Sequence, residues 1–269
     1  MTNNFAKELK ALHKPSSPIV LPNVWDVASF NTVVSLNQDG SKPVKALASA
    51  SWAIAAALGI KDEELTLEQN LEAVAKIASL SETAGLPLSA DLQDGYGSEI
   101  ASTVKRAVEI GVVGANIEDT IPATGDFYPI DEQVQRLQTA LRAAADAGCS
   151  DFVLNARCDT FHFDTGLDEE DALKEAIARG KAYLGAGATT VFYWGGSGRG
   201  LRTAWVERLV KELDGRVAVK LAHKTAGALS TAELAKMGVA RISVGPSLFL
   251  IAQSAVKEAA ASILSGGSL

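Results

Sequence analysis

Residues 86–97 read LPLSADLQDGYG, an apolar run that stops at Asp91 and continues through Gln93 and Asp94 into a turn with two glycines. A buried strand does not accommodate carboxylates without partners, because removing a charge from water is costly. Either this stretch is a surface turn, or the acidic groups have a function where the strand ends. Asp94 precedes a glycine and is typical of a turn, whereas Asp91 lies directly at the end of the apolar run.

Seven other short apolar runs occur along the chain, most of them ending in polar residues, and amphipathic segments separate them. The eight runs are IVLPNVWD (19–26), KALASAS (45–51), LPLSADLQ (86–93), GANIED (114–119), DFVLNARCD (151–159), TTVFYWG (189–195), RVAVKLA (216–222) and ARISVG (240–245). The segment 67–84 has apolar residues at helical spacing, and Thr66 with Gln69 predicts its N-cap. Eight strand–helix alternations with short loops predict an α/β fold, a (β/α)₈ TIM barrel that forms a single domain over residues 1–269.

Composition narrows the class of protein. Hydrophobic residues make up 47% of the chain, so a large core is possible, and the net charge is −7 without any basic run. An acidic surface repels phosphates, which argues against a nucleic-acid partner. Two cysteines favour a reducing compartment, and neither a secretory leader nor a clean membrane span stands out. We therefore expect a cytoplasmic protein with no membrane partner.

Polar side chains gather at the ends of the predicted strands, where TIM barrels carry their chemistry. They include Asp26, Ser49, Ser51, Asp91, Gln93, Glu118, Asp119, Asn155, Arg157, Asp159, Trp194, Lys220, His223 and Ser243. Asp91 and Glu118 follow neighbouring strands, which lie about 5 Å apart in a sheet. Two carboxylates this close repel each other unless a cation joins them, and their oxygens suit Mg²⁺. Arg157, on the next strand, is suited to binding a substrate anion.

Four blocks, in order and spacing, resemble the isocitrate lyase / phosphoenolpyruvate mutase superfamily from about Val20 to the end of the chain. They are LGIKDEELTLEQNLEAVAKIA (58–78), LPLSADLQDGYG (86–97), GANIEDT (114–120) and FVLNARCDTF (152–161). The resemblance implies a (β/α)₈ barrel, Mg²⁺ as cofactor, and a homo-oligomer, a dimer or tetramer, whose eighth helix is swapped between subunits. It also implies an enzyme that makes or breaks C–C or P–C bonds next to a small α-keto or α-hydroxy acid, through a pyruvate enolate.

The resemblance further implies roles for individual residues. Asp91, Gln93 and Glu118 are expected at the metal, with Asp91 as the direct ligand. Arg157, Asp62 and Glu118 are the expected catalytic residues, Arg157 as the clamp on the substrate anion. The expected substrate-binding residues are Ser49, Ala50, Ser51, Arg157 and His223, the last suggested by its place at the end of the seventh strand.

Three departures from the family pattern bear on the reaction. Gln93 replaces an Asp, Trp194 replaces a Glu, and residues 120–131 (TIPATGDFYPID) replace the Lys-Cys-Gly-His motif of the lyases. This pattern is nearer to the mutase, phosphonopyruvate hydrolase and oxaloacetate-cleaving branches. We expect a substrate of the phosphonopyruvate or oxaloacetate type, and a loop at 120–131 that closes as a lid.

Two other functions remain open. Lys220 could form a Schiff base, as in aldolases, although a lysine at a strand end is more often an ion-pair partner. The chain could also be a non-catalytic carboxylate-binding relative, since both Gln93 and the missing thiol motif weaken the case for catalysis. Cys158, beside Arg157, is a possible nucleophile but is more simply a small buried apolar residue.

Overall fold

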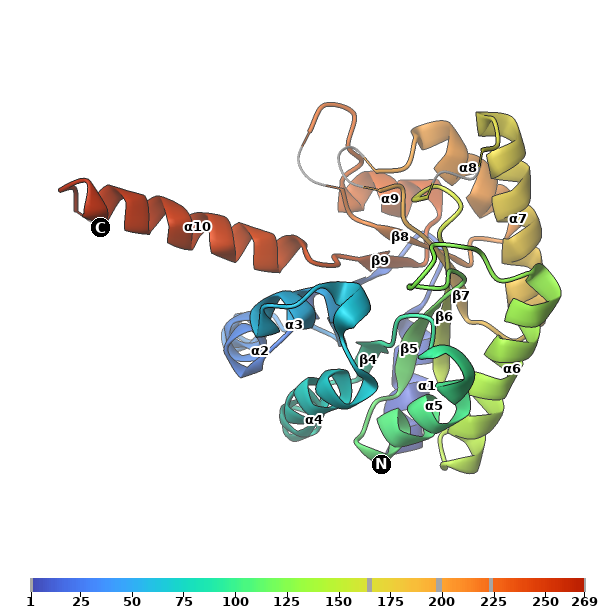
Figure 1. The fold of residues 1–269 in the computed structure, drawn as a ribbon, viewed down its shortest axis with the longest axis horizontal. Coiled ribbons are helices and arrows are strands. Elements are labelled where there is room, and N and C mark those ends of the chain that lie inside the picture. Colours follow the sequence, from blue (N-terminus) through green and yellow to red (C-terminus); the bar gives the residue numbers. More distant parts are fainter. Residues whose placement is uncertain (1, 164–165, 197–199, 223–224, 269) are drawn as a thin grey trace.

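A computed structural model describes residues 2–163, 166–196, 200–222 and 225–268, and its parallel strands form a barrel surrounded by helices (Figure 1). The strands are β1 (Ile19–Leu21), β2 (Asn23–Val24), β3 (Leu47–Ser49), β4 (Leu88–Asp91), β5 (Gly114–Glu118), β6 (Val153–Cys158), β7 (Thr190–Tyr193), β8 (Val217–Lys220) and β9 (Arg241–Ser243). The α-helices are α1 (Thr2–Leu12), α2 (Val27–Val34), α3 (Ser51–Leu58), α4 (Leu67–Thr83), α5 (Ile100–Glu109), α6 (Ile130–Asp146), α7 (Glu169–Gly185), α8 (Thr203–Glu212), α9 (Thr231–Met237) and α10 (Ser247–Leu264). The predicted α/β TIM-barrel class is confirmed.

Pro22 divides the first predicted strand into β1 and β2, because proline has no N–H to donate to a sheet. β1 pairs with β9, and β2 pairs with β3, so this one stretch of chain joins the two edges of the sheet. The carbonyl of Pro22 still accepts a hydrogen bond from the Ala48 N–H at 3.0 Å. The eight predicted strands therefore form a nearly closed barrel, and the first of them is interrupted at Pro22.

The helices begin and end where local sequence signals place them. Thr66 accepts a hydrogen bond from the Gln69 N–H at 3.2 Å, while the Gln69 side chain accepts one from the Thr66 N–H at 3.0 Å. This reciprocal capping box confirms the predicted start of α4. The first helix, α1, covers the end of the barrel where the strands begin. Its buried Leu9 packs close to Gly114, the first residue of β5.

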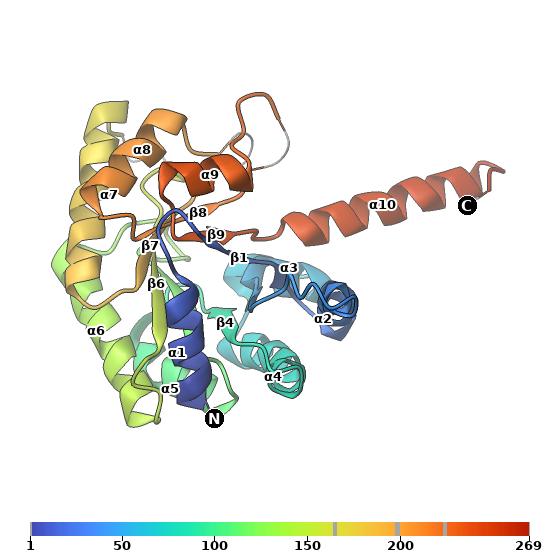
Figure 2. The same ribbon diagram turned by 180° about the vertical axis from the view of Figure 1, so that it is seen from behind.

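The last helix, α10, extends away from the barrel, and no other element lies beside most of its length (Figures 1 and 2). Phe249, at its base, packs edge-on against Trp25 and Trp52, with ring centroids 5.2 and 5.9 Å away. Among the described helices, α10 alone is long and apolar enough to cross a bilayer by length and composition. Lys257 and Glu258 lie near its middle, where a charged side chain is costly in hydrocarbon.

Gly180 generates a stability prediction, because it lets α7 approach the barrel closely. A Cβ added there would collide with the Tyr193 hydroxyl and lie 2.9 Å from Cδ1 of Leu213. Tyr193 is fully buried, and its hydroxyl donates to the Ala176 carbonyl at 2.9 Å. Gly180→Ala should therefore lower the free energy of unfolding by about 1–3 kcal/mol through overpacking. The drop will be visible as a lower thermal midpoint in circular dichroism.

Gly185→Ala is the matched control, because Gly185 ends the same helix and an added Cβ would meet nothing within 4 Å. Alanine is the better helix former, so this variant should be neutral or more stable by up to about 1 kcal/mol. Equal destabilisation by both substitutions would contradict the close-packing argument.

Candidate active site

A small pocket lies at the carboxyl ends of the strands and gathers residues from several staves. It is lined by Asn23, Ala50, Trp52, Asp62, Asp91, Asn116, Arg157, Phe192, Trp194, Lys220, Ser243, Gly245 and Pro246. Its volume is about 50 Å³, which suits a ligand of few atoms and excludes drug-sized molecules. Of the metal-binding, catalytic and substrate-binding residues that the resemblance implies, Ala50, Asp62, Asp91 and Arg157 line this pocket, and Glu118 contacts it through Arg157. Trp194, Lys220 and Ser243, also named at the strand ends, line it as well.

Asp91 ends β4, and hydrogen bonds from β3 and α3 fix its position. The Ser51 N–H and hydroxyl both donate to Oδ2 of Asp91 at 3.3 Å, and the Asp91 N–H donates to Oγ of Ser49 at 2.9 Å. Oδ1 of Asp91 is buried and has no hydrogen-bond partner among the described residues. A buried carboxylate oxygen without a donor is costly, so it marks a place for a cation or a ligand.

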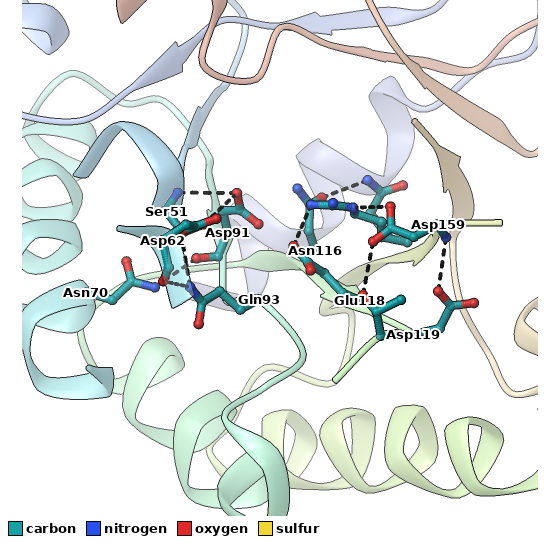
Figure 3. A network of polar contacts seen from close by, with 12 residues as sticks. Ser51, Asp62, Asn70, Asp91, Gln93, Asn116, Glu118, Asp119 and Asp159 are labelled. Atoms are coloured by element: carbon teal, nitrogen blue, oxygen red, sulfur yellow. Dashed lines mark hydrogen bonds and ion pairs between the residues drawn. The ribbon is translucent and has the colours of Figure 1, made fainter. Parts of the chain in front are cut away.

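Asp62 lies beside Asp91 in the short 3₁₀ helix that follows α3 (Figure 3). Burial raises the pKa of Asp62, and the neighbouring Asp91 charge raises it further. The side chain of Gln93 donates to the Asp62 carbonyl at 2.6 Å and to Oδ1 at 3.1 Å. Gln93 therefore acts on Asp62 as a hydrogen-bond donor, and metal ligation by Gln93 stays a prediction.

Glu118 and Arg157 form a buried ion pair on the neighbouring strands β5 and β6. Nη1 of Arg157 donates to Oε1 of Glu118 at 2.5 Å, and Nε donates to Oδ1 of Asp159 at 2.7 Å. Burial raises the pKa of Glu118, an effect that the Arg157 charge opposes. Burial would lower the pKa of Arg157, but Asp159 and Glu118 raise it above its ordinary value. Two carboxylates thus already accept from the guanidinium, and none of the hydrogen bonds among the described residues uses its Nη2.

The aromatic ring of Trp194 lies beside Arg157 at the pocket, and the expectation that it replaces a Glu of the family stays a prediction. Cζ of Arg157 lies 4.7 Å from the Trp194 ring centroid, and the His162 ring stacks on the same indole at 3.9 Å. Burial lowers the pKa of His162, which favours the neutral imidazole. This stack fixes the plane of the guanidinium without adding a negative charge.

Several side chains named from the sequence stabilise the fold around the pocket and do not line it. Oδ1 and Oδ2 of Asp94 accept from the N–H groups of Tyr96 and Gly97 at 3.0 and 3.1 Å, which confirms its predicted turn. Asp119 accepts from the hydroxyl of Tyr183 in α7 at 2.7 Å and anchors that helix to β5. Cys158 is fully buried, which raises its pKa well above the ordinary thiol value and confirms the apolar interpretation.

The structure does not place every predicted site residue at the pocket. His223 lies outside the described residues. Ser49 is fully buried, and the polar groups of Ser51 hold Asp91, so their expected contact with a substrate carboxylate stays a prediction. The loop 120–131 contributes no lining residue, and hydrogen bonds hold it near both ends: Thr120 to Asp159 and Tyr128 to Asp94. Its closure as a lid also stays a prediction.

Sequence reasoning missed Asn23, Asn116 and Arg241 as parts of the site. Asn116 precedes Glu118 by two residues, so the period-two alternation of a strand places both on one face. Arg241 is a charged residue inside an apolar run, which was a usable signal for a buried polar network. It is fully buried and donates to Asn116 at 3.1 Å.

The acidic residues of the pocket fit a divalent cation of the Mg²⁺ type. Within the described part of the chain, no three His, Cys, Asp or Glu side chains come close enough to form a complete metal site by themselves. Mg²⁺ does not require one, because it commonly takes one or two carboxylates and completes its octahedron with water and substrate oxygens. Asp91, with its free Oδ1, and Asp62 supply such a pair.

Known proteins resemble this chain, one along almost its full length and another along about half of it. An uncharacterized protein of Mycobacterium tuberculosis is 25% identical over 263 residues, which cover 96% of this chain and 89% of that protein. The 2-methylisocitrate lyase of Escherichia coli is 31% identical over 154 residues, but these cover only 54% of this chain and 48% of the lyase.

Solved structures share the fold as well. A Burkholderia cenocepacia J2315 protein with the provisional name phosphonomutase is 34% identical, with a TM-score of 0.84 over 99% of this chain and 100% of its own. Oxaloacetate acetylhydrolase, solved with the inhibitor 3,3-difluorooxaloacetate, is 25% identical, with a TM-score of 0.81 over 98% of this chain and 87% of its own.

The sequence pattern of the phosphoenolpyruvate phosphomutase family matches residues 9–264, and the relatives include lyases, mutases and hydrolases. The resemblance predicted from the four sequence blocks is thereby confirmed. The chain belongs to the phosphoenolpyruvate phosphomutase family.

Proposed function

We propose that the protein is a Mg²⁺-dependent enzyme that cleaves or rearranges a C–C or P–C bond of a small α-keto acid through a pyruvate enolate. The observation that carries this proposal is the pair Asp62 and Asp91 at the pocket, with Oδ1 of Asp91 left without a protein partner. Two ionised carboxylates this close repel each other, and a cation between them would offset the repulsion that otherwise favours protonation of Asp62.

Different residues of the pocket would have different roles in such a reaction. Asp91 and Asp62 would hold the cation, and Ser51 and Gln93 fix these two carboxylates by the hydrogen bonds described above. Arg157 would direct its free Nη2 toward the group that leaves or migrates, where negative charge develops. When bound, Mg²⁺ supplies Lewis-acid polarisation of the ketone oxygen.

The absence of the Lys-Cys-Gly-His motif favours the branches that do not need its thiol. Residues 120–131 contain neither Cys nor His, and the described cysteines are both buried. An acid of the oxaloacetate or phosphonopyruvate type is therefore the better substrate candidate than isocitrate or 2-methylisocitrate. The pocket is also small, about 50 Å³, which favours a short acid over a bulky one.

One observation favours the Schiff-base alternative. Lys220 lines the pocket, and burial lowers its pKa, which would make the free amine a better nucleophile. Reduction with borohydride in the presence of pyruvate separates the two functions. A stable mass adduct on Lys220 would support the aldolase, whereas inhibition by EDTA with no adduct would support the Mg²⁺-dependent enzyme.

The first functional prediction concerns Asp91. In a panel of α-keto acids assayed for pyruvate or oxalate release, turnover should require Mg²⁺ and disappear with EDTA. Asp91→Asn should lower kcat/KM by more than the roughly 100-fold that loss of an outer-shell partner costs at a metal site. Full Mg²⁺-dependent turnover by this variant would rule out the proposed site.

Asp168→Asn is the control for this experiment. Asp168 is an exposed N-cap of α7, and asparagine caps a helix equally well, so stability and turnover should both be unchanged. Binding of oxalate with Mg²⁺ but no turnover on any acid would instead favour a non-catalytic carboxylate-binding relative.

The structure also supports a homo-oligomer in which α10 packs against a second copy. One face of α10 carries an apolar stripe of Ala252, Val256, Ala259 and Ile263 at helical spacing. Val256 and Ile263 are 64% and 48% exposed, which is unusual for large apolar side chains outside an interface. Exchange of this helix between subunits, as the sequence resemblance implies, would bury the stripe.

Light scattering after gel filtration tests this assembly. The wild-type mass should be a multiple of 28.1 kDa, and Val256→Glu should shift it toward one chain. Ser254→Glu adds the same charge on the opposite side of α10 and should leave the mass unchanged. A wild-type protein that stays monomeric at all concentrations would contradict the helix exchange.

A further inference from the structure

Arg241 lies inside the barrel, where folds of this kind carry mostly branched apolar side chains. It is the first residue of β9 and is fully buried. β6, β7 and β8 separate β9 from β5 in one direction, and β4, β3 and the interrupted first strand separate them in the other. Nη2 of Arg241 donates to Oδ1 of Asn116 in β5 at 3.1 Å, so this side chain reaches across the barrel to a residue that lines the pocket.

The burial of Arg241 is costly for the fold. Among the described residues, Arg241 forms no ion pair, and its Nη1 has no hydrogen-bond partner. Burial lowers the pKa of Arg241 to about 9, an effect that the charge of Asp91 opposes. A buried charge without a bonded counter-charge opposes folding. The role of Arg241 is therefore to be sought in the groups to which it donates.

A row of polar side chains continues from Asn116 along the inside of the barrel. Nδ2 of Asn155 donates to Oδ1 of Asn116 at 2.7 Å, and the hydroxyl of Thr190 donates to Oδ1 of Asn155 at 2.6 Å. Amide and hydroxyl side chains can each donate or accept. These three residues alone could therefore form the same row in reverse, with Asn116 donating to Asn155 and Asn155 donating to Thr190.

Arg241 fixes the direction of this row. A guanidinium can only donate, so the atom of Asn116 that meets Arg241 is the carbonyl oxygen. Nδ2 of Asn116 then has no acceptor among the described residues, and it is not one of their fully buried unpartnered atoms. Asn116 lines the pocket and is the register partner of Asp91, so its Nδ2 faces the pocket beside Asp91 (Figure 3).

We infer that Arg241 is a positioning residue, which holds the Asn116 amide so that its N–H donates to the ligand oxygen beside Asp91. This inference rests on the proposed function, which places the oxygens of an α-keto acid next to the cation at Asp91. Negative charge grows on the ketone oxygen as an enolate forms, and a donor fixed in advance stabilises that charge. The reversed amide would instead present its own oxygen beside the Asp91 carboxylate and repel the ligand.

A double-mutant cycle of Arg241→Met and Asn116→Ala tests this role, because a residue that acts only through Asn116 has no further effect once Asn116 is removed. The probe is oxalate, titrated calorimetrically with Mg²⁺ present. Each single variant should raise Kd for oxalate by about tenfold to a hundredfold, the usual cost of losing a hydrogen bond to a charged group. The double variant should bind oxalate as Asn116→Ala does, within about twofold.

Titration with Mg²⁺ alone separates orientation of the amide from loss of the positive charge. Arg241→Met removes a cation that interacts with Asp91, so Mg²⁺ should bind this variant at least as tightly as the wild type. Arg142→Met is the control, because Arg142 is an exposed residue of α6 and the chemical change is the same. Both Kd values should be unchanged in this control.

Two other substitutions keep the test informative if Arg241→Met is unstable. Arg241→Lys retains a charged group that can only donate, so it should retain most of the affinity for oxalate. Arg241→Gln can present either an oxygen or a nitrogen to Asn116, so it no longer fixes the direction of the row and should weaken oxalate. Equal affinity in these two variants would contradict the role of Arg241 as a donor.

The remaining outcomes also decide the inference. Additive losses in the double variant would mean that Arg241 acts independently of Asn116. A lower thermal midpoint with unchanged Kd for oxalate would make Arg241 a purely structural residue, and weaker binding of Mg²⁺ alone would indicate general damage to the pocket. If the cycle shows the expected coupling but no α-keto acid is turned over, the positioning role stands and the proposed reaction fails; if the wild type binds neither Mg²⁺ nor oxalate, both fail.

Discussion

The repulsion between Asp62 and Asp91 is the constraint on which the site depends. Folding brings these two carboxylates together at the barrel mouth, although burial and mutual repulsion both favour protonation of Asp62. The surrounding chain relieves this repulsion only in part with a cation of its own, because Arg157, whose charge lowers the pKa of Asp62, is paired with Glu118 and Asp159. It supplies neutral donors instead, from Ser51 and Gln93, which orient the carboxylates and leave Oδ1 of Asp91 open. Under the proposed function, an external cation would bind between these two carboxylates.

The barrel could be predicted from the sequence because its signals are local and repeated. Each stave is an apolar run that ends in polar residues, and the capping box at Thr66 fixes a helix start without reference to tertiary structure. The same rule placed Asp91, Glu118 and Arg157 at one rim. Pro22 also indicated that the first predicted strand is interrupted, since a proline inside a strand removes a hydrogen bond between strands.

What the sequence did not predict depends on contacts between distant segments. The commitment of Arg157 to two carboxylates follows from the side-chain geometry of β5 and β6, and strand order alone does not reveal it. Arg241 could not be paired with Asn116 and Ser243 until the barrel closed, because 125 residues separate it from Asn116. The composition of α10 likewise does not reveal that this helix extends away from the barrel. An equally apolar helix could pack against the sheet of its own chain.

The replacement of an Asp by Gln93 fits the charge balance of the pocket better than it fits a loss of function. With a divalent cation bound, as proposed, the charges of Asp62 and Asp91 would be offset. A carboxylate at position 93 would add a further negative charge beside Asp62 and repel a substrate that itself carries two. The amide instead donates to Asp62 at 3.1 Å and stabilises its ionised form. Under the proposed function, the amide at position 93 would therefore lower the electrostatic cost of binding an anionic substrate beside Asp62.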